Sequence, residues 1–203
     1  MATGNRFTKD EGQTRYVYDV WNFDFKAFAA AESGKTNPAL IFGTGLTAID
    51  TVFSLWDGGW KKPIIMLSRR ALLPAIHETY TPYSGVPVNE NSLLGLMRDL
   101  REKSRKAASW QAVIDSLRPD MLRLWSALSV KEKRYFFRKL FTYWNIHRHR
   151  MAPEIGNPLT RAIEKQQVML KQGGLVSVDV KPDSVLVRTP SETFSTAVLF
   201  HCV

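Results

Sequence analysis

The hydrophobic pattern of residues 39–67 predicts a strand, a helix and a second strand in immediate succession. Ala39–Phe42 are apolar residues that run into Gly-Thr-Gly, as in a buried strand that ends at a tight turn. Apolar residues then recur every three or four positions over Leu46–Trp56, which predicts an amphipathic helix, and the Asp-Gly-Gly at 57–59 suits its C-terminal end. A second apolar run, Pro63–Leu67, completes a βαβ unit of about 30 residues, the usual length of such units.

The remainder of the chain changes first to helical and then to strand periodicity. Ser129 and Glu132 have the spacing of a capping box at the start of a helix. The tail alternates apolar and polar positions, which predicts strands over 175–180, 185–189 and 196–203. Helices are expected over Leu93–Lys106, Trp110–Leu117, Pro119–Leu128, Lys131–Trp144 and Pro158–Gln172.

These elements predict an α/β fold: a Rossmann-like three-layer architecture with a parallel sheet, a helical insertion, and a C-terminal β-hairpin with a return strand. We expect a single domain over 1–203. Within it the βαβ unit takes residues 39–74, the helical insertion 88–160, and the last helix and strands 161–203, while residues 1–38 lead into the first strand.

The composition fits a globular protein and limits its chemistry. With 203 residues, of which 44% are hydrophobic and 23% charged, the chain can form one domain with a substantial core. Cys202 is the only cysteine, so packing is its expected role and no disulfide framework exists. His147 and His149 lack a third ligand at a useful spacing, so no metal site is expected. Without a leader or an apolar run near 18 residues, we expect a cytoplasmic protein with no membrane association.

The turn after the first strand has the glycine spacing of a dinucleotide-binding loop. In such loops the first glycine permits the tight turn, the second lets the backbone approach a pyrophosphate, and a third small residue lets helix pack on strand. The amides that open the helix then face the anion, supported by the helix dipole. A turn that serves packing alone is the alternative. The residues expected to hold the pyrophosphate are Gly43, Thr44, Gly45, Leu46 and Thr47.

The end of the second strand favours NADP(H) over NAD(H). NAD sites place an acidic residue there to bind the ribose 2′-hydroxyl, whereas NADP sites place small polar and arginine residues for the 2′-phosphate. Here the strand ends in Ser68-Arg69-Arg70 with no acid nearby, and guanidinium groups are bidentate donors to phosphate. The alternative is that both arginines are solvated surface charges.

Three segments of the sequence resemble a known family. "GTGLTAID", "LSRRALLPAIH" and "YWNIHRHRMAPE" are similar to segments of the bacterial FAD/NAD(P)-binding oxidoreductase family, which belongs to the flavoproteins with two dinucleotide domains. In such proteins an NAD(P) domain is inserted into an FAD domain, and the chain crosses between them at apolar strands that end in Ala-Thr-Gly. The resemblance therefore implies that this chain is the inserted NAD(P)-binding domain of an FAD-dependent oxidoreductase.

The same resemblance assigns roles to the two ends of the sequence. Met1-Ala2-Thr3-Gly4 matches the end of one crossing strand, and "AVLFHCV" looks like the return strand. Residues 1–38 would then connect to an FAD domain outside this chain. No second G-x-G-x-x-G is present, so FAD is expected only in the parent protein, and hydride would pass from the nicotinamide to that flavin. The alternative is that Met1 is a native start and that the module works with a separate flavoprotein.

Much of the net charge of +9 is concentrated between residues 131 and 150, where seven lysines or arginines accompany one acid. A charge of this sign favours anionic partners. The aromatic residues of this segment recur with helical spacing, which predicts a helix face directed to the core rather than a nucleic-acid stacking platform. That face comprises Phe136, Phe137, Leu140, Phe141 and Trp144.

The residues after this helix are further candidates for contacts with the nicotinamide nucleotide or an acidic substrate. They are His147, Arg148 and Arg150, with His77 as a fainter candidate. A C-terminal cap in which cations meet the helix dipole, and a buried histidine at His77, are the alternatives. No catalytic residue can be assigned. Two other functions stay open: a basic module that binds nucleic acid or an acidic partner, and a degenerate Rossmann scaffold that binds nothing.

Overall fold

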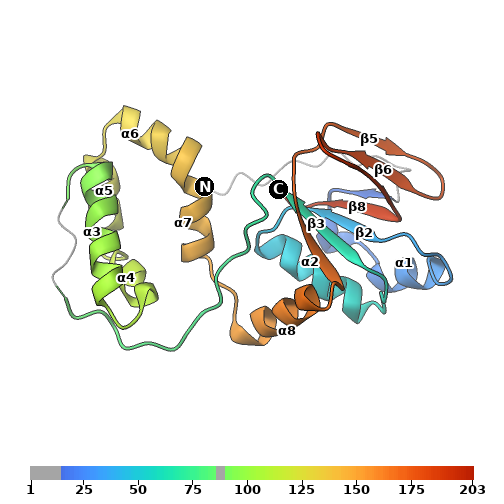
Figure 1. Cartoon of the computed structure of the whole chain (residues 1–203), viewed down its shortest axis with the longest axis horizontal. Helices are drawn as coiled ribbons and strands as arrows, with labels where there is room; N and C mark the ends of the chain where they lie inside the picture. The colour runs from blue at the N-terminus through green and yellow to red at the C-terminus, as the bar shows by residue number, and fades with distance from the viewer. Residues whose placement is uncertain (1–14, 86–89) are drawn as a thin grey trace. The chain divides into compact units, whose positions relative to one another are not determined.

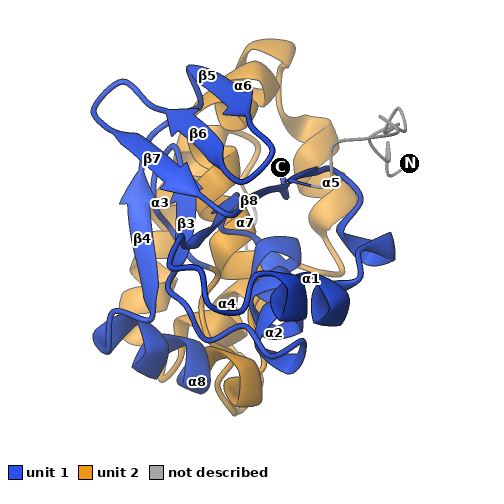
Figure 2. Ribbon diagram, turned by 90° about the vertical axis from the view of Figure 1, so that its right-hand side faces the viewer, with its two compact units in different colours: residues 1–73, 157–203 blue, residues 74–156 orange. Residues whose placement is uncertain are grey.

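The computed structural model describes residues 15–85 and 90–203. The chain divides into two compact units, which Figure 2 colours separately: unit 1 comprises residues 1–73 and 157–203, and unit 2 comprises residues 74–156. The segment Met1–Gly4, to which the family resemblance gives a role, lies outside the described residues. Among the described helices, none has both the length and the apolar character that crossing a bilayer requires.

Unit 1 is built on a five-stranded sheet in which every pairing is parallel, as predicted. Its strand order is β1-β8-β2-β3-β4, so β8, the last strand in the sequence, lies between β1 and β2. The strands are β1 (Tyr16–Val17), β8 (Val198–His201), β2 (Ala39–Phe42), β3 (Ile64–Ser68) and β4 (Val168–Gln172).

The two faces of this sheet are covered by different layers, which confirms the three-layer prediction. On one face Leu40, Leu67 and Leu199 form a core with Val185 and Val187 of a three-stranded antiparallel sheet. On the other face α1 (Phe25–Ala31) and α2 (Leu46–Asp57) lie against the strands, as Figure 1 shows. The antiparallel sheet consists of β5 (Ser177–Val180), β6 (Val185–Arg188) and β7 (Thr193–Thr196).

The predicted helix over Pro158–Gln172 is wrong in its second half. Helix α8 (Pro153–Glu164) ends earlier, and the following apolar residues form β4 at the edge of the parallel sheet. The chain leaves the helix through Gln166, whose φ of 57° lies in the left-handed region. Glycine usually occupies such a helix end, so a glutamine gives the sequence pattern no stop signal.

Unit 2 is helical, and its core lies between its first three helices. Leu100, Val113, Leu117 and Leu124 form this core. Ser129 caps the next helix, and the reciprocal contact from Glu132 confirms the predicted capping box. The elements are α3 (Leu93–Lys106), α4 (Trp110–Ser116), α5 (Met121–Ala127), α6 (Val130–Tyr135), a π-helical turn (Phe136–Leu140) and α7 (Phe141–Arg148).

The aromatic face predicted over residues 136–144 is present, but it is not buried as predicted. None of its five members is buried: Phe137 is 58% exposed, Phe141 is 40% exposed, and Phe136, Leu140 and Trp144 are half-buried. The aromatic rings nevertheless remain on one side of the helix, because Phe136 meets Phe141 and Trp144 at 6.3 and 6.5 Å between centroids, and Phe137 meets Phe141 at 5.5 Å. The stripe therefore stays intact, and Trp144 packs against the core of unit 2 while Phe137 and Phe141 stay exposed.

Candidate functional site

The strand order of unit 1 reverses at β2, because the chain continues from β2 to β3 on one side and returns as β8 on the other. In open parallel sheets of this kind, ligands bind outside the carboxyl ends of the strands at such a reversal. The glycine turn Gly43–Gly45 lies at the carboxyl end of β2 and leads directly into α2. The fold therefore places the turn where a ligand crevice is expected.

Gly43 is held between the two neighbouring strands. Its amide donates to the Leu67 carbonyl at 2.8 Å, while the Cys202 amide donates to the Phe42 carbonyl at 2.8 Å. Its φ is 134°, and a Cβ built there would lie 2.6 Å from the Cys202 carbonyl oxygen. Glycine is required here by the return strand itself, because any side chain would collide with the backbone after β8.

The amino end of α2 is open. Gly45 is the N-cap residue, and no side chain among the described residues caps this end. The first intrahelical bond is donated by the Ile49 amide to the Gly45 carbonyl, at 3.1 Å, so the amides of residues 46–48 have no partner within the helix. A Cβ built at Gly45 would meet no atom within 4 Å. The backbone thus presents donors and a partial positive charge to open space, which is the arrangement that binds phosphate.

A hydroxyl bridge joins the glycine turn to the end of β3. Thr44, which is 8% exposed, donates through Oγ1 to Ser68 Oγ at 3.0 Å. The Ala71 amide donates to the same Ser68 oxygen at 3.0 Å. These bonds fix the loop after β3 against the turn after β2, so Thr44 and Ser68 position the site in addition to lining it.

Arg69 and Arg70 follow Ser68 at this same edge of the sheet. Because β2 and β3 are parallel, with Phe42 opposite Leu67, both strands end together. Arg69 is exposed and Arg70 is half-buried. The structure thus brings the predicted pyrophosphate and 2′-phosphate residues to one edge of unit 1.

The other candidate residues belong to unit 2. His77 lies beside Met151, to whose carbonyl its amide donates at 2.7 Å, and its ring meets the edge of Tyr80 at 5.6 Å between centroids. His147 donates through Nδ1 to the Tyr143 carbonyl at 2.7 Å, one turn earlier on α7. Arg148 is half-buried in the last turn of that helix.

Arg150 forms a buried ion pair. Its side chain is 5% exposed, and Nη2 donates to Asp115 Oδ2 at 2.6 Å. The Tyr80 hydroxyl donates to the same carboxylate oxygen. Burial raises the pKa of Asp115, but the hydrogen bonds from Tyr80 and Arg150 outweigh it and hold that pKa below its ordinary value. Arg150 Nη1 is buried and has no partner among the described residues.

An aromatic cluster at the carboxyl end of β8 is a feature that the sequence reasoning missed. His201 lies opposite Phe42 in the parallel register, and their rings stack at 5.5 Å between centroids. Tyr16 and Tyr18 meet the imidazole edge-on at 6.2 and 5.2 Å. Burial lowers the pKa of His201 below its ordinary value, which favours the neutral ring. The sequence held one indication of this cluster. If the apolar segments "ALIF" and "VLFH" are paired as adjacent parallel strands, His201 lies beside the glycine turn.

Two chemistries find no support in the described residues. Burial raises the pKa of the Cys202 thiol to about 11, so this sulfur is protonated at neutral pH and is a poor nucleophile. The described part of the chain contains no group of three or more histidine, cysteine or acidic side chains placed to hold a metal ion.

Comparison with known proteins gives distant structural similarity. No protein-family model and no curated protein matches the sequence. Among solved structures, a pyridine nucleotide-disulfide family oxidoreductase from Enterococcus faecalis V583 is similar with a TM-score of 0.37, 8% identity, and coverage of 83% of this chain and 22% of that one. The lysine monooxygenase NbtG from Nocardia farcinica, described with an NADPH domain, has a TM-score of 0.43, 16% identity, and coverage of 87% and 34%.

A third similar structure is the ornithine N-hydroxylase KtzI from Kutzneria sp. 744, with reduced FAD, NADP⁺ and L-ornithine. Its TM-score is 0.38 at 15% identity, with coverage of 82% of this chain and 35% of that one. The chain thus spans between about a fifth and a third of the length of these oxidoreductases. The interpretation of the site therefore rests on its own geometry.

Proposed function

We propose that unit 1 binds NADP(H) at the turn between β2 and α2. The observation that carries the proposal is the open amino end of α2, with Gly45 facing empty space at the point where the strand order reverses. A pyrophosphate fits this end, because the amides of Leu46 and Thr47 have no acceptor within the helix and a Cβ built at Gly45 would meet no atom within 4 Å.

Each part of the site has a defined role in this proposal. The amides that follow Gly45 hold the pyrophosphate, while Arg69 and Arg70 receive the 2′-phosphate at the end of the neighbouring strand. The bond between Thr44 and Ser68 keeps these two halves of the site together. The apolar rings around His201 form the wall at the other side of the strand-order reversal.

The bound cofactor would supply hydride, and the resemblance to two-domain flavoproteins supports a flavin outside this chain as the proposed acceptor. The protein's own contribution is to bind and orient the nucleotide. His201 and Cys202 lie at the end of the strand beside β2, and burial disfavours the charged form of each, so this wall favours an uncharged part of the cofactor.

A comparison of NADPH with NADH tests the proposal. Titration calorimetry on the full chain should show tighter binding of NADPH, and the double variant Arg69→Ala/Arg70→Ala should remove most of that preference while leaving NADH binding nearly unchanged. The matched control is Arg161→Ala/Lys165→Ala, which removes two exposed cations beside the amino end of β4. Equal affinities for NADPH in the parent and the Arg69/Arg70 variant would refute the assignment, and a chain that binds neither nucleotide would be a scaffold.

A second candidate function has support from one observation. Tyr135, Phe137 and Tyr143 are 53%, 58% and 47% exposed. The exposed cations Arg134 and Arg138 flank the first two of these rings in the sequence. Exposed rings between cations can stack on the bases of a single-stranded nucleic acid. Fluorescence anisotropy with a labelled oligonucleotide should then show an affinity that falls steeply between about 50 and about 200 mM salt. A weak affinity that does not change with salt would exclude this function.

A further inference from the structure

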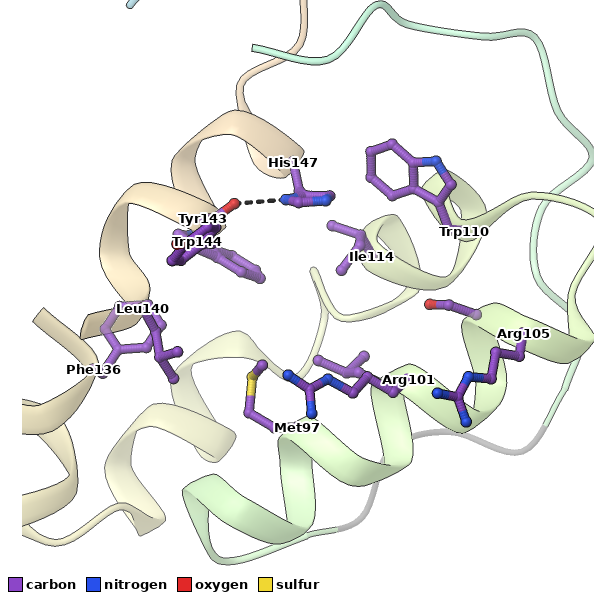
Figure 3. Close-up of a pocket in the computed structure, with 12 residues that line it drawn as sticks. Met97, Arg101, Arg105, Trp110, Ile114, Phe136, Leu140, Tyr143, Trp144 and His147 are labelled. Atoms are coloured by element: carbon purple, nitrogen blue, oxygen red, sulfur yellow. Dashed lines mark hydrogen bonds between the residues drawn. The ribbon is translucent and has the colours of Figure 1, made fainter. Parts of the chain in front are cut away.

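Unit 2 contains a cavity to which neither proposed function assigns a role. It lies between α3, α4 and the helix that includes the π-turn and α7, and its volume is about 580 Å³. Figure 3 shows its two sides, with Met97, Arg101 and Arg105 projecting from α3 and Trp110 and His147 on the opposite side. This volume falls in the range of about 300 to about 1,000 Å³ that is typical of small-molecule sites.

The walls of the cavity are mostly hydrocarbon and aromatic. Met97 and Leu100 contribute from α3, Ile114 from α4, and Leu140 and Trp144 from the opposite helix. Apolar walls bind a ligand by removing its apolar surface from water, so affinity should rise with the length of an alkyl chain. The cavity therefore suits a ligand whose body is apolar.

Two arginines lie on the α3 side of this apolar space. Arg101 and Arg105 stand one helical turn apart on α3, both line the cavity, and both are exposed. Like charges at this spacing repel each other and destabilise a helix unless an anion lies between them. Of the described residues that line the cavity, none is acidic.

Both acidic residues of α3 form ion pairs with lysines of the same helix. Asp99 accepts from Lys103 at 2.6 Å, and Glu102 accepts from Lys106 at 2.6 Å. Neither Arg101 nor Arg105 forms an ion pair with another described residue. The helix thus neutralises its lysines internally and leaves two guanidinium groups at the cavity.

The opposite side of the cavity offers a fixed ring. The Nδ1–H of His147 donates to the Tyr143 carbonyl at 2.7 Å, and the ring meets Trp110 at 4.9 Å between centroids with planes at 78°. These contacts hold the imidazole in one orientation at the wall. The cavity therefore combines apolar walls with two guanidinium groups on the α3 side and a hydrogen-bonded imidazole on the opposite side.

We propose that this cavity binds an amphipathic carboxylate, in which an apolar body fills the space between the helices and a single carboxylate lies between Arg101 and Arg105. Bidentate guanidinium–carboxylate hydrogen bonds fix the head, and the body is held by burial. Two kinds of compound share this chemistry, a medium-chain fatty acid and an aromatic carboxylic acid. The proposal concerns unit 2 alone and does not depend on dinucleotide binding by unit 1.

Titration calorimetry of the full chain tests the proposal with four probes. These are decanoate, naphthalene-2-carboxylate, decanol as the uncharged analogue and decyltrimethylammonium as the cationic analogue, each below its micelle concentration. At least one carboxylate should bind saturably, and about tenfold more tightly than the uncharged and cationic probes. If decanoate is the better ligand, octanoate should bind about twofold to fourfold more weakly for each methylene removed. If the naphthoate is better, the ligand class is aromatic.

Two sets of variants locate the binding. Arg101→Gln/Arg105→Gln should weaken the carboxylate about tenfold, whereas the control Arg134→Gln/Arg138→Gln, with the same spacing but away from this cavity, should not. Ile114→Trp should abolish binding by filling the space. Circular dichroism should show unchanged folding of both arginine double variants, because all four side chains are exposed.

Results of three kinds would overturn the proposal. One is that neither carboxylate binds. Another is that decanol binds as tightly as decanoate, or that the Arg101/Arg105 variant keeps full affinity. The third is that this variant loses NADPH and not a carboxylate, which would make the arginines part of a nucleotide site.

Discussion

The backbones of Gly43 and Cys202 approach each other closely at the point where the sheet of unit 1 reverses its strand order. A Cβ at Gly43 would lie 2.6 Å from the Cys202 carbonyl oxygen. The φ of Gly43 is 134°, a backbone angle that residues other than glycine rarely adopt. Two residues later, a Cβ at Gly45 would meet nothing within 4 Å. The two glycines of one short motif therefore differ in their surroundings: the first admits the return strand, and the second leaves open space, which the proposed function assigns to the pyrophosphate.

Gly43→Ala should destabilise unit 1. Backbone strain and the collision with Cys202 together should lower the free energy of unfolding by about 2 to 5 kcal/mol. The control is Gly59→Ala, where φ is also positive, at 95°, but no atom lies within 4 Å of the added Cβ. Urea denaturation followed by circular dichroism should show the larger loss for Gly43→Ala. Equal losses in the two variants would mean that the contact with Cys202 adds no constraint.

Gly45→Ser should move stability and cofactor affinity in opposite directions. Serine is a better N-cap than glycine, so its hydroxyl should satisfy one amide of α2 and raise the stability of unit 1 by a few tenths of a kcal/mol. The same hydroxyl would occupy the proposed pyrophosphate position, so NADPH should bind at least about tenfold more weakly. Thermal unfolding and calorimetry check the two effects. A variant that binds NADPH as tightly as the parent would show that the cofactor does not use this helix end.

Arg150→Gln should destabilise unit 2 by about 3 kcal/mol, because it leaves the Asp115 carboxylate without its buried partner. Arg118→Gln is the control, since Arg118 is 3.5 Å from the same carboxylate but 57% exposed, and its loss should cost less than about 1 kcal/mol. Urea denaturation of the two variants measures the difference. Similar losses would show that the buried pair has no special weight.

The effect of Arg150→Gln should depend on pH. The folded state lowers the pKa of Asp115 below its ordinary value of 3.8, so the ion pair stabilises the protein above that value and its contribution is lost as the pH falls through the lowered pKa. The stability difference between the parent and Arg150→Gln should therefore be full near pH 7 and should shrink as the pH falls below about 4. Denaturation at both pH values tests this. A difference that is constant with pH would contradict the assigned role of Asp115.

The elements that the sequence predicted best are those whose signals are local. The βαβ unit, its glycine turn and the capping box of Ser129 and Glu132 each depend on residues within one or two turns of each other, and the structure has all three. The parallel sheet followed from the βαβ unit, because two strands joined through a helix run in the same direction.

The predictions that failed depended on signals that the sequence lacks or on distant partners. Strand β4 was missed because the chain leaves α8, which ends at Glu164, through a left-handed Gln166 and not a glycine, so the sequence carries no stop signal. The stripe at Phe137 and Phe141 was predicted to be buried because helical spacing indicates a common apolar face but not whether another element covers that face. His201 was missed because its neighbours Phe42 and Tyr16 come from remote parts of the chain.

Backbone NMR during a titration with NADPH tests the central claim most directly, since it reports on the amides that are proposed to hold the phosphates. The account predicts that the largest shifts of the ¹⁵N–H signals occur at Gly45, Leu46 and Thr47, with further shifts at Arg69 and Arg70, and that they saturate together. Saturable binding that leaves the signals of residues 45–47 in place and moves only those of unit 2 would contradict it.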